Sequence, residues 1–342
     1  MLDGSRTFEH RGDAAQSTAD GDHCAWSGSP TIHVGLVNNM PDAAFGRTER
    51  QFDELLREAA GSRIRVRLHL LAIPEVARGK VTALEMQDRY RDVSDLARMS
   101  LDALIVTGAE PRTRLLPDEP YWGALTRLID WAEDNVSSAI WSCLAAHAAA
   151  KHLDNIDRRP VGPKCFGLFD CEVKPRHSLV AGLTKKLWIP HSRYNELAEE
   201  DLLRAGYSIL TRSKVAGVDM FSKKCKRSLF VFFQGHPEYD PQSLWREYRR
   251  DIARFLAGER NDYPRPPQNY LTADDMRACQ SFEARATASR HPDLIPAIPA
   301  TAEASLSSCW RPSAVLIYRN WLQQVANLQK TRVSARAMAD SR

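Results

Sequence analysis

Residues 139–150, "AIWSCLAAHAAA", place a cysteine where an apolar run typical of a strand gives way to one typical of a helix. This residue, Cys143, is either buried filler, a common role for free cysteine, or a nucleophile on a sharp strand-to-helix turn. Such a turn sets the sulfur near the positive end of the helix, which favours the reactive thiolate. The local sequence leaves both interpretations open, so the decision rests on the rest of the chain.

Strand and helix patterns alternate up to this turn and through it. Strands are predicted at 31–37, 64–73, 101–109 and 137–142, and helices at 48–61, 121–135 and 144–153. The first helix is expected to begin at Thr48, which forms a capping box with Gln51, and to stop at Gly61. The alternation predicts an α/β fold with a largely parallel sheet flanked by helices. Sites in such sheets lie at the carboxyl ends of the strands, where Cys143 stands.

The second half of the chain is more mixed. "SILTRS" and "KRSLFVFFQG" have strand patterns and flank "FSKKCK", which predicts a basic hairpin turn, and helices are predicted at 242–257 and 313–328. We divide the chain into a mobile tail, an α/β domain, an irregular insertion or linker, and a C-terminal helix that packs on the domain and ends loosely. Their ranges are 1–29, 30–270, 271–308 and 309–342.

Composition excludes several classes of protein. The 342 residues are 43% hydrophobic and 26% charged, and the net charge of +4 indicates no particular affinity for nucleic acid or anionic lipid. The first residues lack the apolar core of a secretory signal, and no segment is apolar enough for a membrane helix. The seven cysteines include no C-x-x-C pair, which disfavours disulfide frameworks and zinc sites. We expect a cytoplasmic protein without metal, nucleic-acid or membrane partners.

A candidate base follows another predicted strand, in "FVFFQGHPEYD" (230–240). Pro237 biases His236 toward an extended conformation, and residues two apart on an extended chain point to the same side. Glu238 can therefore reach the imidazole, orient it and stabilise its charged form. The alternative is a surface turn with a solvated histidine. His147, four residues after Cys143 on the same helical face, is a rival base, but it has no acidic partner in the local sequence.

At this point the chain resembles a known family. "GLVNNMP", "LDALIVTGAEP", "PHSRY", "GHPEYD" and "YRRDI" occur in the order found in the homoserine O-succinyltransferase family of methionine biosynthesis. The likeness runs from about residue 31 to 270 and resumes at "CWRPSAVLIYRNWL". The resemblance implies a class I glutamine amidotransferase-like fold and a homodimer. It also implies acyl transfer from acyl-CoA, a co-substrate, to the hydroxyl of L-homoserine through a cysteine thioester, without a further cofactor.

The resemblance assigns roles to individual residues. Cys143 matches the acyl-accepting cysteine, His236 the general base and Glu238 its partner. Substrate-binding positions are matched by Lys164 in "GPKCFGLF", Ser192 in "PHSRY" and Arg250 in "YRRDI". By pattern alone Arg250 is a solvated charge, because it falls opposite the apolar stripe of the predicted helix 242–257. Only the family match makes it a ligand for the carboxylate of the amino acid.

The chain also departs from the family pattern. Leu144 stands where the family usually has a bulky residue such as tryptophan, and His147 where it has glutamine. The backbone N–H groups of Leu144 and Asn39 are the predicted oxyanion donors. The lysine that follows "MP" in the family is absent, and 271–308 has no counterpart. These changes put the substrate in doubt more than the chemistry.

The acyl donor is predicted from the loop "TGAEPRTRLL" (107–116). One position after this glycine turn is a glycine in family members that use succinyl-CoA and acidic in those that use acetyl-CoA. Alignment without gaps puts Arg112 there. Arg112 is either an exposed loop residue or a guanidinium that grips a terminal carboxylate bidentately. The second interpretation predicts succinyl-CoA over acetyl-CoA.

Three alternatives stay open. A glutamine amidotransferase-like cysteine hydrolase could use the same Cys–His–Glu set, although such enzymes usually flank the nucleophile with glycines, whereas Ser142 and Leu144 stand here. An acyltransferase could act on serine in place of homoserine. A non-enzymatic relative could retain the fold, but the intact set of Cys143, His236 and Glu238 argues against it.

Overall fold

The computed structural model describes residues 30–174, 176–301 and 308–340, with the side chains of 331–340 left out. The predicted tail 1–29 lies outside the described residues. The core is a ten-stranded sheet in the order β3-β2-β1-β4-β5-β10-β9-β8-β6-β7. Neighbours are parallel from β3 to β10 and antiparallel from β10 to β7. The predicted α/β fold is confirmed, and the sheet is mixed because hairpin-type connections link its second half.

The parallel half of the sheet carries the strands that lead to the site. It consists of β3 (Arg91–Asp92), β2 (Arg65–Ala72), β1 (Thr31–Val37), β4 (Ala103–Val106), β5 (Ser138–Ser142) and β10 (Ser228–Phe233). The antiparallel half consists of β9 (Gly217–Cys225), β8 (Ser208–Ser213), β6 (Arg159–Val173) and β7 (Lys186–Glu196). In β10, Phe233 pairs with Ser142 of β5, so the ends of these two strands lie side by side.

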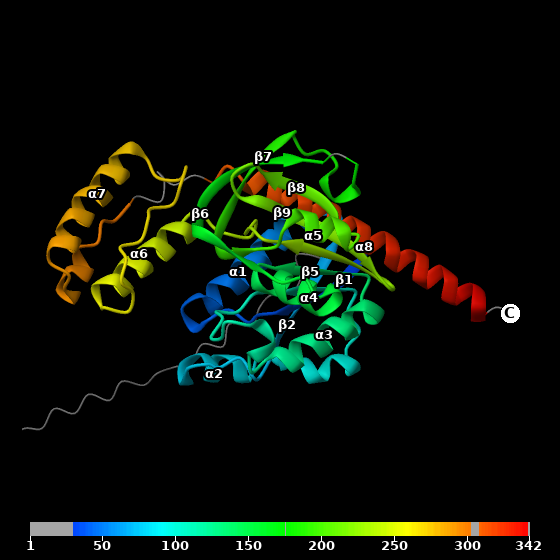
Figure 1. Ribbon diagram of the computed structural model, residues 1–342. Helices are drawn as coiled ribbons and strands as arrows, with labels where there is room; N and C mark the ends of the chain where they lie inside the picture. The colour runs from blue at the N-terminus through cyan, green and yellow to red at the C-terminus, as the bar shows by residue number, and fades with distance from the viewer. Residues whose placement is uncertain (1–29, 175, 302–307, 341–342) are drawn as a thin grey trace, which may run out of the picture.

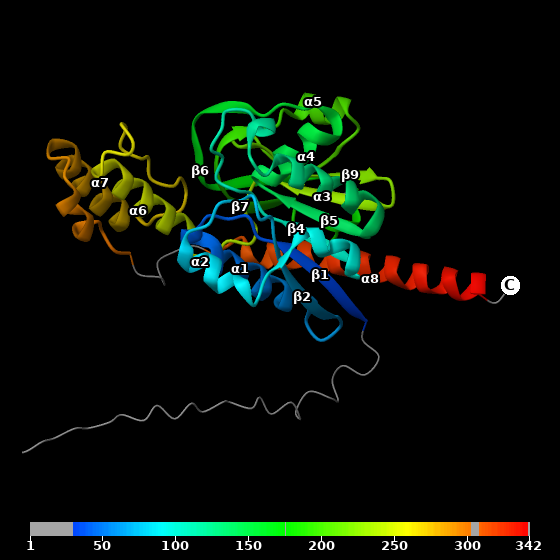
Figure 2. The same ribbon diagram turned by 90° about the horizontal axis from the view of Figure 1, so that it is seen from below.

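Helices cover both faces of the sheet (Figure 2). α1 (Asp42–Ala60) and α8 (Arg311–Asp340) lie on one face, and α3 (Trp122–Asn135), α4 (Leu144–Asp154) and α5 (Glu199–Arg204) on the other. The remaining helices are α2 (Lys80–Gln87), α6 (Ser243–Leu256) and α7 (Ala273–Ala288). Short 3-10 helices are η1 (Val93–Arg98), η2 (Leu116–Asp118), η3 (Ser178–Val180) and η4 (Pro292–Ala297). Among the described residues, no helix is long and apolar enough to cross a bilayer.

Each face of the sheet packs into its own hydrophobic core. Along β10, Val231 and Phe233 join the core under α1 and α8, whereas Phe230 and Phe232 join the core under α3 and α4. Side chains of a strand alternate between faces, so a strand buried on both sides is apolar throughout. This explains why "SLFVFF" reads as an unbroken apolar run.

Two predicted boundaries are wrong. Helix α1 begins at Asp42, after Pro41, and the predicted capping residues Thr48 and Gln51 are buried inside it. The helix starts earlier because buried Phe45 extends its apolar stripe toward the N-terminus. The segment "FSKKC" is the end of strand β9 and not a turn. The chain reverses later, at Lys226, whose φ of 43° is left-handed.

The segment 271–308 is not irregular throughout, which corrects that prediction. Helix α7 occupies 273–288, and Thr272 caps it by accepting a hydrogen bond from the Asp275 backbone N–H at 3.1 Å. Cys279, Phe282 and Ala286 form its buried stripe. This stripe is too short to stand out in the sequence, and it is buried only because α7 lies beside α6 (Figure 1). Residues 302–307 of the predicted insertion lie outside the described residues.

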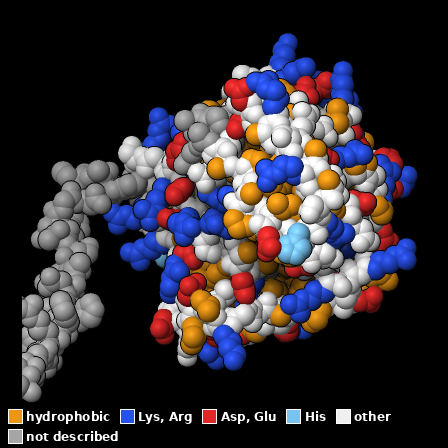
Figure 3. Space-filling model, turned by 90° about the vertical axis from the view of Figure 1, so that its left-hand side faces the viewer, with side chains coloured by type: hydrophobic (Ala, Val, Ile, Leu, Met, Phe, Trp, Pro, Cys, Tyr) orange, Lys and Arg blue, Asp and Glu red, His pale blue; other side chains and the backbone are white. Residues whose placement is uncertain are grey.

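The C-terminal helix packs on the sheet, as predicted. Trp321 of α8 is buried and donates from Nε1 to Ser138 Oγ of β5 at 2.9 Å. At the opposite end of the molecule, α6 and α7 extend beyond the sheet (Figure 1). Figure 3 faces this end, where basic, acidic and apolar side chains are interspersed.

We expect Phe282→Ala to lower the free energy of unfolding by about 3–5 kcal/mol, because it opens a cavity under α7. Gln280→Ala, on the exposed side of the same helix, should change it by less than about 0.5 kcal/mol. Urea titration of both variants measures the difference. Equal effects would mean that α7 is not held by its buried stripe.

Candidate active site

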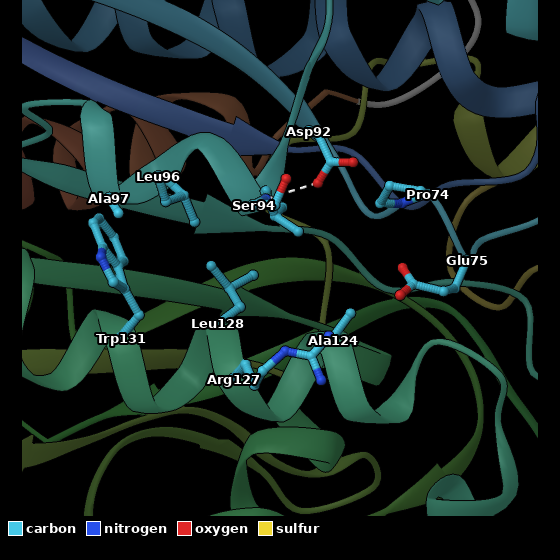
Figure 4. A pocket seen from close by; sticks show the side chains of 11 residues that line it. Pro74, Glu75, Asp92, Ser94, Leu96, Ala97, Ala124, Arg127, Leu128 and Trp131 are labelled. Carbon is cyan, nitrogen blue, oxygen red and sulfur yellow. Dashed lines mark hydrogen bonds between the residues drawn. The ribbon is translucent and has the colours of Figure 1, made fainter.

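A cavity of about 250 Å³ lies at the carboxyl ends of β4, β5 and β10, and both Cys143 and His236 line it. Its other walls come from the loop after β1, from β6, β7 and from α6. A larger cavity, of about 340 Å³, lies between η1 and α3, where Asp92, Arg127 and Trp131 line it (Figure 4). In that cavity Asp92 accepts from the Ser94 backbone N–H, and no cysteine or histidine is among the described lining residues. Chemistry, and not size, therefore selects the first cavity.

Cys143 occupies the predicted strand-to-helix turn. Its φ of 52° and ψ of −114° are rare for a residue with a side chain, and it is the N-cap of α4. Its backbone N–H donates to Phe233 O at 2.7 Å, which extends the β5–β10 pairing by one residue. Gly108 lets the loop after β4 approach this turn, since a Cβ there would lie 3.0 Å from the Leu144 nitrogen. The thiol thus stands above the sheet, at the positive end of the helix.

His236 and Glu238 form the predicted contact. Glu238 Oε1 lies 2.8 Å from His236 Nδ1, and both side chains are buried. The ring stacks on Tyr239 at 4.3 Å, and its backbone N–H donates to Pro190 O at 2.8 Å. Burial alone would lower the pKa of His236. The charges of Glu238 and Cys143, with a hydrogen bond from each, outweigh burial and raise that pKa well above its usual value. The arrangement favours the charged form of the His236 ring.

The rival base, His147, is held neutral. Its ring is buried, and burial lowers its pKa to about 3. Its Nε2 lies 3.0 Å from Gln234 Oε1, an oxygen that also accepts from the Leu197 backbone N–H at 2.8 Å. Because that oxygen is an acceptor, Nε2 carries the proton of His147. His147 therefore lines the cavity as a neutral, hydrogen-bonded residue, and His236 remains the candidate base.

The predicted substrate-binding residues gather around two carboxylates that sequence reasoning missed. Lys164 Nζ lies 3.0 Å from Asp251 Oδ2, and Arg250 Nη2 lies 3.2 Å from Asp251 Oδ1. Ser192 Oγ donates to Glu247 Oε2, whose other oxygen accepts from Tyr239 Oη at 2.6 Å. Burial opposes ionisation of Asp251, but the charges of Lys164 and Arg250 keep its pKa below the usual value. The spacing of the two acids, one helical turn apart on α6, was the available signal.

Local backbone geometry brings these side chains together. Lys164 lies in an irregular part of β6, where the pairing with β7 shifts register between Pro160 and Cys165. Ser192 pairs with Phe166 across the same two strands. Arg250 is half-buried on the polar side of α6, and the helix begins shortly after "HPEYD", so its polar side reaches the cavity.

Two predicted site residues lie elsewhere. The Asn39 backbone N–H donates to Thr107 Oγ1 at 2.8 Å, so it is already committed, and Asn39 lines a neighbouring cavity. Arg112 is exposed and lines that same neighbouring cavity. The Arg112 backbone N–H donates to Glu119 Oε1 at 2.7 Å, and Arg112 is not among the residues that line the cavity of Cys143. Of the two predicted oxyanion donors, only Leu144 lines the cavity of Cys143.

A second buried acid supports the turn that carries the base. Asp219 of β9 accepts from the Gly235 backbone N–H at 3.2 Å and from Thr211 Oγ1 at 2.7 Å. His191 Nε2 lies 3.4 Å from the same carboxylate. A Cβ at Gly235 would lie 2.5 Å from Asp219 Oδ1, so only glycine lets the backbone pass this close. The sequence offered no pattern for this contact, because it joins residues of three strands with the turn that follows β10.

Burial raises the pKa of Asp219 from 3.8 to about 6. A raised pKa contributes stability that is fully present below the unfolded value and is lost as the pH rises through about 6. Asp219→Asn removes this dependence. We therefore expect the unfolding free energy of the variant, relative to wild type, to increase by up to about 3 kcal/mol between pH 4 and pH 7.5. Urea titrations at both pH values measure it, and a constant difference would contradict it.

Comparison with known proteins identifies the family of this chain. The family model "Homoserine O-succinyltransferase" matches residues 24–332. The homoserine O-succinyltransferase of Rhodopseudomonas palustris is 49% identical over 86% of this chain and 89% of its own length. That of Bradyrhizobium japonicum is 47% identical over 86% and 90%. A glutamine amido transferase from Methylobacillus flagellatus shares the fold, with a TM-score of 0.51 at 14% identity over 86% of this chain and 94% of its own. The chain therefore belongs to the homoserine O-succinyltransferase family.

Proposed function

We propose that this enzyme transfers an acyl group from acyl-CoA to the hydroxyl of L-homoserine, in methionine biosynthesis, through a thioester on Cys143. The observation that carries the proposal is the placement of Cys143 and a buried His236–Glu238 pair in one cavity, which Ser192 and Arg250 also line. Family membership supports homoserine as the acceptor.

In the first half of the reaction, His236 takes the proton of the Cys143 thiol through Nε2, because Glu238 occupies Nδ1. The thiolate attacks the thioester carbonyl carbon of acyl-CoA. The bond to the CoA sulfur then breaks, and the departing thiolate takes the proton from His236. The product is an acyl group in thioester linkage to Cys143.

In the second half, His236 takes the proton of the homoserine hydroxyl, whose oxygen attacks the thioester carbon. The Cys143–acyl bond breaks, and the sulfur regains its proton from His236. The Leu144 backbone N–H at the start of α4 stabilises the oxyanion in both steps. Since the Asn39 N–H is committed to Thr107, we assign the second donor to the turn at Gly108 and Ala109, which lines the cavity.

The wall formed by β6, β7 and α6 suits an amino acid. Arg250 offers guanidinium donors to the substrate carboxylate, and Glu247 offers a carboxylate to its ammonium group. Ser192 holds the Glu247 carboxylate in place, and Lys164 holds that of Asp251. A side chain one methylene shorter, as in serine, would leave the hydroxyl farther from His236, so we favour homoserine. We also infer a cytoplasmic homodimer, on composition and family resemblance, which sedimentation of the pure protein tests.

Intact-mass measurement tests the central step. We expect wild-type protein mixed with succinyl-CoA, without acceptor, to gain the mass of one succinyl group, and L-homoserine to remove it. Cys143→Ala should gain none and lose turnover by several orders of magnitude while remaining folded. If Cys143→Ala keeps wild-type turnover, the thioester route is wrong. Release of ammonia from glutamine, without acyl transfer, would instead favour the cysteine hydrolase alternative.

Glu238→Gln should lower the pKa of His236, because the carboxylate charge that helps to raise it is lost. A charged imidazole favours the reactive thiolate, so we expect alkylation of Cys143 by iodoacetamide at pH 6 to be roughly tenfold slower in the variant than in wild type. The difference should shrink at pH 9. Asp154→Asn, which removes a carboxylate hydrogen-bonded to Tyr207 away from the cavity, is the control. An unchanged alkylation profile in Glu238→Gln would remove Glu238 from this role.

A further inference from the structure

The basic residues of the active-site cavity differ in whether they have an anionic partner. Five of them line it within the described part of the chain: Arg158, Lys164, Arg193, Arg250 and Arg254. Four lie within 4 Å of a carboxylate: Lys164 and Arg250 of Asp251 at 3.0 and 3.2 Å, Arg254 of Glu110 at 3.2 Å, and Arg193 of Glu196 at 3.7 Å. Among the residues that the structure describes, none provides Arg158 with such an ion pair.

Arg158 is also partly removed from water. Its Nη2 donates to the Arg114 carbonyl oxygen at 3.3 Å, a long and neutral contact. Burial lowers its pKa from 12.5, while the more distant charges of Tyr121 and Glu119 act in the other direction. Glu119 cannot turn to it freely, because its Oε1 accepts from the backbone N–H groups of Arg112 and Thr113. A half-buried guanidinium without a carboxylate partner is costly unless a ligand supplies the anion.

The position of Arg158 indicates which ligand group that is. The residue lies between α4 and β6 in the chain, and it is close enough to Cys143 and His147 for its charge to act on both. The amino-acid groups come from β6, β7 and α6. His147 is neutral, so Arg158 is the cation nearest to this part of the cavity that has no internal partner. The acceptor takes the amino-acid wall, so Arg158 is the cation that remains for an acyl group on Cys143.

We propose that Arg158 binds the terminal carboxylate of a dicarboxylic acyl group carried on Cys143, the role that sequence analysis gave to Arg112. This rests on the proposed function, and it names the donor as an acyl-CoA whose four-carbon acyl group ends in a carboxylate, such as succinyl-CoA. A guanidinium binds a carboxylate through two parallel hydrogen bonds, so the acyl chain is held in one orientation. An acetyl group has no carboxylate and does not reach Arg158.

Competition between donors tests the proposal. Succinyl-CoA and butyryl-CoA carry acyl chains of equal length and differ in the terminal carboxylate. We expect wild type to prefer succinyl-CoA, and Arg158→Met to lower kcat/KM for succinyl-CoA about 10- to 100-fold while leaving butyryl-CoA and acetyl-CoA within about twofold. Arg158→Lys, which keeps the charge without the planar fork, should fall between them. The ratio of succinyl to butyryl transfer is measured with the two donors in one sample. A partly unfolded variant lowers both rates equally and leaves this ratio unchanged.

Arg112→Met is the matched control, because Arg112 is an arginine of the neighbouring cavity. It should leave the donor ratio unchanged. Equal losses with all three donors in Arg158→Met would assign Arg158 to a phosphate of CoA, and a selective rise in KM for homoserine would assign it to the amino-acid carboxylate. Either result overturns the proposal. In both cases wild type still forms the Cys143 adduct, whereas failure of the proposed function would remove the adduct itself.

Discussion

The site depends on one backbone pairing, the parallel contact of β5 with β10. It places Phe233 beside Ser142, and the Cys143 N–H then closes on the Phe233 carbonyl. Without this register the nucleophile and the base, which are far apart in the chain, would leave the sheet at different places. Shifting a strand by one residue would also move its side chains to the opposite face, so the two hydrophobic cores fix the register. The energy that positions the catalytic groups is therefore spread over the buried residues of the sheet.

A second constraint is the cost of burying charge. The cavity brings together acidic and basic side chains whose burial would cost stability if they were unpaired. Nearly all of them form ion pairs within the protein. Glu247 and Asp251 tie Lys164, Ser192 and Arg250 into one network, so the amino-acid wall is pre-organised before substrate arrives. Arg158 differs from these residues, because no carboxylate of the described residues forms an ion pair with it, and in our proposal the acyl group supplies that carboxylate.

The turn at Cys143 has a strained backbone and the turn before His236 is crowded, and neighbouring hydrogen bonds stabilise both turns. Cys143 has a left-handed φ, which the β10 hydrogen bond and the start of α4 stabilise together. Gly235 passes against the buried Asp219 carboxylate, which holds the turn before His236 from beneath. Cys143 and His236 are therefore held through their backbones as well as by their own contacts, which gives the candidate site a fixed geometry.

The sequence by itself determined the α/β class, the strand and helix on either side of Cys143, and the pairing of His236 with Glu238. These features depend on periodicity and on residues close together in the chain, and the same is true of the family motifs. The tertiary structure alone decided which half of the sheet is antiparallel, that α7 is a helix, and that Asn39 and Arg112 face a neighbouring cavity. It also decided that Glu247, Asp251 and Arg158 belong to the site. Those outcomes depend on contacts between distant segments, where a charged side chain that looks solvated in sequence becomes a buried partner once another strand or helix lies against it.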